Sequence, residues 1–234
     1  MKILDSNEYI SEKLNISQVS KDMLSKYKKD PYVDKKTRKF INDNNVKWNP
    51  VTFRYDCDGN IEISEDIVYD GKLKIRFGKV YGHFDCSNNN LTTLEGAPQE
   101  VNGNFYCRNN KLTTLEGAPK EVGGSFHCSD NKLTTLEGAP KKVGGYFDCS
   151  DNQLTTLEGA PNMVGGDFDC KHNNLTTLEG APQKVNGYFS CSNNQLKSIE
   201  KAPNEVDGDF YCYNNSSLVL PKEKPSWIKG EIYD

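Results

Sequence analysis

Hydrophobic positions recur in one pattern of 21 residues over most of the chain. Written from its proline, the unit reads P-x-x-V-x-G-x-F-x-C-x-x-N-x-L-x-x-L-x-G-A. Side chains two apart on a strand share a face, so Phe105 and Cys107 are expected to point inward. Asn104, Tyr106 and Arg108 are then expected to point outward. The Gly-Ala-Pro segment turns the chain without a helix. The pattern therefore predicts one coil of a solenoid.

Stacking of such coils is required for stability. One unit offers too few apolar side chains to offset the entropy lost when its chain is ordered. One asparagine per coil is placed to bond the turn backbone of neighbouring coils. Cysteine recurs at the inward strand position, at Cys86, Cys107, Cys128, Cys149, Cys170, Cys191 and Cys212. The expected asparagine ladder is Asn89, Asn110, Asn131, Asn152, Asn173 or Asn174, and Asn194.

The unit resembles a known repeat. Its F-x-C-x-x-N-x-L stretch is similar to the leucine-rich-repeat signature L-x-L-x-x-N-x-L, with phenylalanine and cysteine in two leucine positions, over about residues 60–220. The LEGAP and VGG-x-F-x-C wording is more closely similar to leucine-rich-repeat proteins of tailed bacteriophages and some bacteria. The resemblance implies a β-rich solenoid of about seven coils plus one degenerate coil, with a parallel sheet on a concave face. It also implies a binding role.

Four segments are expected along the chain. They are an N-terminal helical leader that caps the first coil (1–50), capping strands and a degenerate coil (51–80), the solenoid (81–215) and a C-terminal cap (216–234). Trp227, Ile228 and Ile232 are expected to close the last coil.

The apolar spacing predicts helices at 6–14 and 17–29, and a third helix from Asp30 through Ile41. Strands are predicted at 51–56 and 61–69, with a turn at 58–60 between them. The degenerate coil places Ile61, Ile63, Asp66 and Val68 in the four positions of the signature, 23 residues before the next coil. Cys57 has no place in the cysteine ladder.

The repeat is acidic and the leader is basic. Residues 1–50 carry 11 basic and seven acidic side chains, whereas residues 51–234 carry 18 basic and 26 acidic ones. Because binding to phosphates depends on lysine and arginine, nucleic acid is not expected as a partner of the repeat. The cysteines lack metal-ligand spacing, and a ladder of buried thiols suits a reducing compartment. No apolar run is long enough for a signal peptide or a membrane span, so a cytoplasmic location is expected, in the host cell if a phage encodes the chain.

The outward strand positions vary most from coil to coil, which makes them the candidate binding surface. They are rich in tyrosine, which offers a large contact area at little entropic cost. Three aspartates on adjacent coils are expected to lie close together and to attract a cationic group, so the expected partner is a protein with a basic surface. The candidate contact residues are Tyr106, Arg108, His127, Tyr146, Asp148, Asp167, Asp169, Tyr188, Tyr211 and Tyr213.

Other functions have weaker support in the sequence. The best candidate for a catalytic pair, His83 with Asp85, lies on an open sheet, so no catalytic residue and no cofactor are expected. Calcium binding by the three aspartates lacks further oxygen ligands on a flat sheet. A threonine pair recurs in five coils, as in ice-binding solenoids, but one threonine of each pair should turn inward.

The sequence therefore predicts a non-catalytic module that binds a protein through its concave face. The phage resemblance implies an inhibitor or modulator of a host protein, such as a defence protein. The alternatives are a phage structural or assembly component that uses the basic leader, and an ice-binding or purely structural solenoid.

Overall fold

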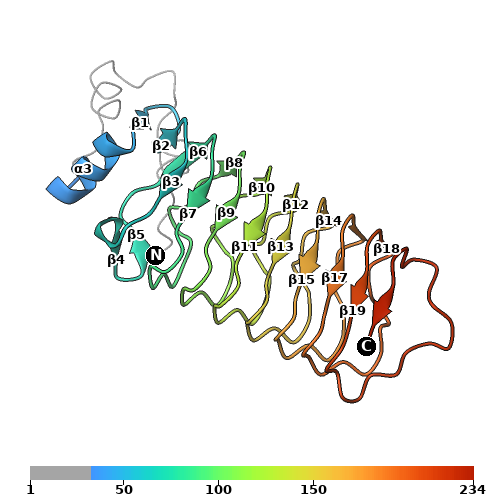
Figure 1. The fold of residues 1–234 in the computed structure, drawn as a ribbon. Coiled ribbons are helices and arrows are strands. Elements are labelled where there is room, and N and C mark those ends of the chain that lie inside the picture. The colour runs from blue at the N-terminus through green and yellow to red at the C-terminus, as the bar shows by residue number, and fades with distance from the viewer. Residues whose placement is uncertain (1–32) are drawn as a thin grey trace, which may run out of the picture.

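The predicted β-rich solenoid is confirmed, with about nine turns rather than seven coils and one degenerate coil. A computed structural model describes residues 33–234, which stack about nine turns into two nine-stranded sheets (Figure 1). Sheet B contains, in spatial order, β3 (Ile61–Glu62), β7 (Phe84–Asp85), β9 (Phe105–Tyr106), β11 (Phe126–His127), β13 (Phe147–Asp148), β15 (Phe168–Asp169), β17 (Phe189–Ser190), β19 (Phe210–Tyr211) and β20 (Ile232–Tyr233). All of its pairs are parallel, and most join residues 21 apart, as Phe126 joins Phe147.

Sheet A was not predicted. It is built from the P-x-x-V half of each unit, where only a return of the chain was expected. Its strands, in spatial order, are β1 (Val46–Asn49), β2 (Arg54–Cys57), β6 (Phe77–Val80), β8 (Glu100–Val101), β10 (Glu121–Val122), β12 (Lys142–Val143), β14 (Met163–Val164), β16 (Lys184–Val185) and β18 (Glu205–Val206). All pairs are parallel except β1 with β2.

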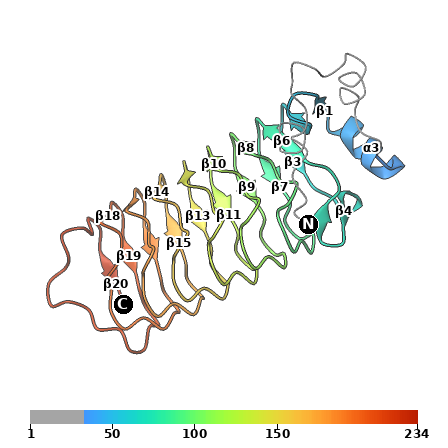
Figure 2. The same ribbon diagram turned by 180° about the vertical axis from the view of Figure 1, so that it is seen from behind.

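The two sheets also correct the expected concave face. Strands in a sheet lie about 4.8 Å apart, so coils that carry a strand on both walls have the same spacing on both. Because the coil spacing is the same on both walls, the stack is not expected to curve into a horseshoe. Figures 1 and 2 show the coils following one another along a nearly straight line. The outer surface of sheet B is therefore long and nearly flat rather than concave.

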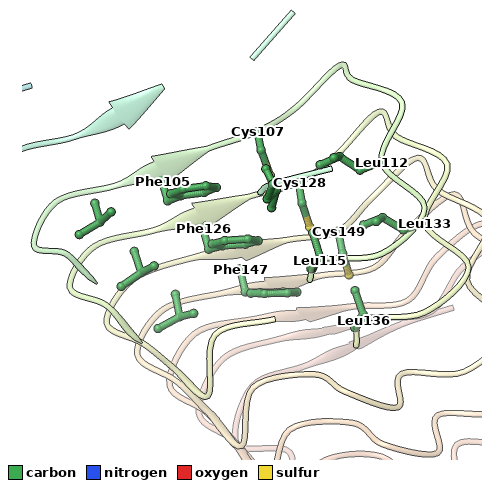
Figure 3. Close-up of a cluster of buried hydrophobic side chains, with 14 of the residues drawn as sticks. Phe105, Cys107, Leu112, Leu115, Phe126, Cys128, Leu133, Leu136, Phe147 and Cys149 are labelled. Carbon is green, nitrogen blue, oxygen red and sulfur yellow. The ribbon is translucent and has the colours of Figure 1, made fainter. Parts of the chain in front are cut away.

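The core consists of repeated columns of phenylalanine, cysteine and leucine (Figure 3). Phe126 stacks on Phe105 and Phe147, with ring centroids 5.1 and 5.5 Å apart. The seven ladder cysteines are buried free thiols, as predicted. The Cys128 thiol donates to the carbonyl of Asp148 in the next coil, at 3.2 Å, and burial raises its pKa well above the usual value. These thiols are packing groups, because a reactive cysteine needs a thiolate.

Cys57 has a place that the sequence did not reveal. It is buried on β2 and aligns with Val80 of sheet A, so it occupies the valine position of its coil rather than the cysteine position. Cysteine substitutes there as a small hydrophobic residue.

The asparagine ladder is confirmed. Asn131 donates to the carbonyls of Cys107 in the preceding coil and Cys128 in its own, at 3.0 and 3.2 Å. Its Oδ1 accepts the backbone N–H of Leu112, at 3.1 Å. In the coil where two asparagines adjoin, Asn173 is the ladder member and Asn174 is exposed. Each amide thus satisfies backbone groups that burial would otherwise leave without partners.

Each Leu-Glu-Gly-Ala turn depends on its glycine. Gly138 has φ of +87°, and a side chain there would collide with the backbone of Leu115 and Glu116 in the preceding coil. We expect Gly138→Ala to lower the free energy of unfolding by at least about 1–2 kcal/mol, because the left-handed conformation alone costs that much. Gly59→Ala is the matched control, since nothing lies within 4 Å of its added Cβ. Equal urea midpoints for the two variants would contradict this account.

The first coils differ from the predicted boundaries. Helix α3 spans Lys35–Asp43, capped by Asp34, whose Oδ1 accepts the N–H of Thr37 at 2.9 Å. The predicted helices at 6–14 and 17–29 lie outside the described residues. Phe40 and Ile41 of α3 are buried in the core.

The strands predicted at 51–56 and 61–69 are shorter in the structure, as β2 and β3, and they lie in different sheets, β2 in sheet A and β3 in sheet B. After Ile63 the degenerate coil leaves the signature. A 3-10 turn, η2 (Glu65–Ile67), buries Ile67 instead of Val68, and a small hairpin follows from β4 (Val68–Tyr69) and β5 (Lys72–Leu73). At the far end, Ile228 is buried and the Trp227 ring lies 5.5 Å from that of Phe210.

No helix among residues 33–234 has the length and apolarity needed to cross a bilayer.

Candidate protein-binding face

The outward side chains of sheet B form three columns, which we call the sheet B face. The first column contains His83, Asn104, Ser125, Tyr146, Asp167, Tyr188 and Asp209. The second contains Asp85, Tyr106, His127, Asp148, Asp169, Ser190 and Tyr211. The third contains Ser87, Arg108, Ser129, Ser150, Lys171, Ser192 and Tyr213. The serines of the third column are buried, so Arg108, Lys171 and Tyr213 are its accessible side chains. All ten candidate contact residues lie on this face.

The first column has a structural role that sequence reasoning missed. Most of its side chains accept the backbone N–H of the equivalent residue one coil later. Asn104 Oδ1 accepts from Ser125 at 2.8 Å, and Asp167 Oδ1 accepts from Tyr188 at 2.9 Å. The predicted contact residue Asp167 therefore supports coil stacking. Tyr146 and Tyr188 differ, because each places a phenol ring where neighbouring coils place an acceptor.

Asp148 and Asp169 lie opposite each other in β13 and β15, so they are adjacent as predicted. Both carboxylates already have partners within the protein, so neither requires an external cation. Asp169 is only 2% exposed, and its Oδ2 lies 2.8 Å from Lys171 Nζ and accepts the Tyr146 hydroxyl at 3.1 Å. The Asp169 hydrogen bond raises the pKa of Lys171. Asp148 lies 3.7 Å from His127 Nδ1 and accepts the Ser150 hydroxyl at 2.7 Å.

The acid stability of the fold should depend on Asp148. Burial by itself would raise its pKa, but His127, Ser150 and Ser129 outweigh burial and hold the pKa below the usual value. An unfolded aspartate has a pKa of about 3.9, so the unfolded chain binds the proton first as the pH falls. The stabilisation is complete above about pH 5 and is lost as the pH falls through the lowered folded pKa. The difference in urea midpoint between wild type and Asp148→Asn should therefore be larger at pH 6 than at pH 3. An equal difference at both pH values would contradict the assignment.

Seven aromatic rings form a continuous line along the face, which we call the aromatic track: His83, Tyr106, His127, Tyr146, Tyr188, Tyr211 and Tyr233. Successive ring centroids are 6.5, 4.9, 5.3, 6.3, 5.6 and 4.9 Å apart. The Arg108 guanidinium lies 5.9 Å from the centre of the Tyr106 ring. The sequence singled out five of these rings as contacts but did not reveal that they touch. Tyr233 was not predicted because it lies in the C-terminal tail, beyond the last recognisable 21-residue repeat.

Tyr213 extends the aromatic surface beside the track and is 40% exposed. Tyr146 is more enclosed, and burial raises the pKa of its hydroxyl, which therefore stays protonated and can donate to Asp169. The face thus presents aromatic rings and hydroxyls on a support fixed by internal hydrogen bonds. Such preorganisation lowers the entropic cost of binding.

Other surfaces have fewer features of a functional site. A hollow of about 960 Å³ lies along sheet A, lined by Arg54, Arg76, Glu95, Glu100, Lys120 and Glu121 among others. Its charges are partly paired, as in Arg76–Glu95 at 3.5 Å, and it holds no nucleophile beside a base. The threonine pairs lie on a third wall of the coils, outside the two sheets. There Thr134 is exposed, but Thr135 is half-buried and its hydroxyl accepts the N–H of Glu137 at 3.1 Å. In each pair the first threonine is exposed and the second is half-buried rather than turned fully inward.

The described residues contain no group of three or more His, Cys, Asp or Glu side chains arranged to hold a metal ion. Comparisons of the chain with protein-family models, with curated proteins and with solved structures found no match.

Proposed function

We propose that the protein is a non-catalytic solenoid of the leucine-rich-repeat type that binds a protein partner through its sheet B face. The aromatic track carries this proposal. Coil stacking explains the buried phenylalanines and the asparagine ladder, and it explains acceptors such as Asp167. Stacking does not require an aromatic ring at these positions, because other coils carry serine there, as at Ser125 and Ser190. Aromatic side chains are costly to leave exposed to water and are enriched where interfaces gain their binding energy.

The leucine-rich-repeat assignment rests on the roles of the signature residues. Phe126, Cys128 and Leu133 are buried at the three leucine positions, and Asn131 bonds the backbone as the signature asparagine should. Sheet A is a departure from the expected pattern, because it places a second strand on the opposite wall of each coil. The sequence motifs of the repeat support a phage origin. A phage origin would place the protein in the host cytoplasm, as an inhibitor or modulator of a host protein.

The proposed partner presents a basic surface. Five aspartates lie on the sheet B face, against the cations Arg108 and Lys171. Asp148 and Asp169 are partly offset by His127 and Lys171, so the attraction is expected mainly at other aspartates, such as Asp85 and Asp209. Inhibition would follow from steric occlusion of the host protein.

A pull-down from bacterial lysate tests the function. Tagged wild type is compared with the double variant Tyr146→Ser, Tyr188→Ser, which copies the serine found at Ser125 in the same column. Met163→Ser is the control, because Met163 is 54% exposed on sheet A. We expect one stoichiometric partner that the double variant loses and the control keeps. A partner held equally by all three proteins would favour an assembly role of the leader, and no partner would favour a structural or ice-binding solenoid.

A further inference from the structure

The sheet B face is long and narrow, which restricts the shape of its partner. Nine strands spaced about 4.8 Å apart give a length of about 38 Å, and three outward positions per coil give a width of about 13 Å. A standard interface buries about 800 Å² on each partner in a broad patch. Such a patch would overhang the face on both sides. An extended polypeptide of about 11–12 residues, at about 3.3–3.6 Å per residue, matches its length.

Ring orientation narrows the chemistry further. Tyr106 stacks on His127 with an angle of 15° between the rings, and Tyr211 stacks on Tyr233 with an angle of 12°. In these pairs the ring faces are turned to each other, and Arg108 lies over Tyr106. Nucleic-acid bases and sugar rings bind aromatic side chains through the ring face, which in these two pairs is covered by the neighbouring ring. The other neighbouring rings of the track meet edge-on or tilted, at 55° to 88°. Ring edges, phenol hydroxyls and carboxylates remain, and these suit backbone N–H groups and cationic side chains.

The carboxylates lie along the whole length of the track. Asp85 flanks its first rings, Asp148 and Asp167 its middle, and Asp209 its last rings, where the Tyr211 hydroxyl donates to Asp209 at 3.2 Å. A partner that meets all of these groups needs positive charges spread over more than 20 Å, given a coil spacing of about 4.8 Å. An extended basic segment provides that distribution.

We infer that the partner contacts this protein through a single extended basic segment that lies along the aromatic track, parallel to the solenoid axis. This inference rests on the proposed function and specifies the kind of protein surface that the face accepts. Backbone N–H groups of the segment would donate to the hydroxyls and carboxylates. Its lysines or arginines would be spaced to meet Asp85, Asp167 and Asp209.

A display library of linear peptides of about 12 residues, panned on the full chain, tests the inference. We expect enrichment of peptides with net positive charge. Their affinity for Tyr146→Ser, Tyr188→Ser should fall at least about tenfold, the loss typical of removing central aromatic contacts. Met163→Ser should bind them as wild type does. Oligothymidylate and a cellulose-type oligosaccharide are titrated in parallel, followed by tyrosine fluorescence, and should not bind.

The outcomes separate the inference from the proposed function. If no linear peptide is enriched but the pull-down partner still depends on Tyr146 and Tyr188, the extended segment is wrong and the protein-binding face stands. If the peptides fail and the partner does not depend on these tyrosines, both are wrong. Tyrosine-dependent binding of the oligosaccharide or the oligonucleotide would overturn the peptide assignment and replace the partner class.

Discussion

Replacing Asn173 by alanine should lower the free energy of unfolding by about 3 kcal/mol or more. Its amide donates to the carbonyls of Cys149, Cys170 and Lys171 at 3.0, 3.1 and 3.2 Å, and its Oδ1 accepts the N–H of Leu154 at 2.9 Å. Each buried polar group left without a partner costs about 1–3 kcal/mol, and Asn173 serves groups in two coils.

Asn174→Ala is the matched control, because Asn174 follows Asn173 directly but is exposed. Surface substitutions usually change the free energy of unfolding by less than about 0.5 kcal/mol. Urea denaturation of both variants measures the difference. If the two variants unfold at the same urea concentration, the asparagine ladder does not hold the coils together.

Phe147→Ala is expected to cost about 3–5 kcal/mol, as is typical when a buried phenylalanine is truncated. Phe147 is fully buried, and its ring stacks between those of Phe126 and Phe168, at 5.5 and 5.3 Å. Coils contact only their neighbours, so a cavity in a central coil weakens the coupling between the two halves of the stack. Thermal unfolding of the variant should therefore broaden or split into two transitions.

Met163→Ala serves as the comparison for Phe147→Ala, because Met163 is an exposed hydrophobic residue of a neighbouring coil. It should leave the melting temperature nearly unchanged. A Phe147→Ala melting temperature close to that of Met163→Ala would show that the stacked rings contribute little to stability.

The strict 21-residue period made the core predictable. Phe126, Cys128 and Asn131 each repeat at one position of every coil, and a period of two around Phe126 fixes which side chains turn inward. Stacking then follows from the need to bury them. The same residues predicted sheet B and the asparagine ladder, and the structure shows both.

Sheet A could not be read from the sequence. Its strands from β8 onward, such as Glu121–Val122, are two residues long, which is too short to display an alternating pattern. Pairing with the neighbouring coils, rather than local propensity, makes them strands. Cys57 was left unplaced for the same reason, because its position is defined only by alignment with Val80 in sheet A.

The candidate site was predictable in location but not in detail. Variation between coils identified the outward positions of sheet B. It could not show that Asp167 bonds the next coil or that Asp169 is buried beside Lys171, because both depend on side-chain rotamers, which the repeat pattern does not specify. The aromatic track was hidden because its rings come from two columns, as in the step from His127 to Tyr146.

Photo-cross-linking tests the central claim, that the sheet B face is the binding surface, most directly. A photoreactive phenylalanine analogue is placed at Tyr188 on the track. In separate proteins it is placed at Met163 on sheet A and at Thr134, on the wall that carries the threonine pairs. The account predicts that irradiation in lysate joins a partner protein to position 188 and leaves positions 163 and 134 without that product. Cross-linking of the same partner from position 163 or 134, with none from position 188, would contradict it.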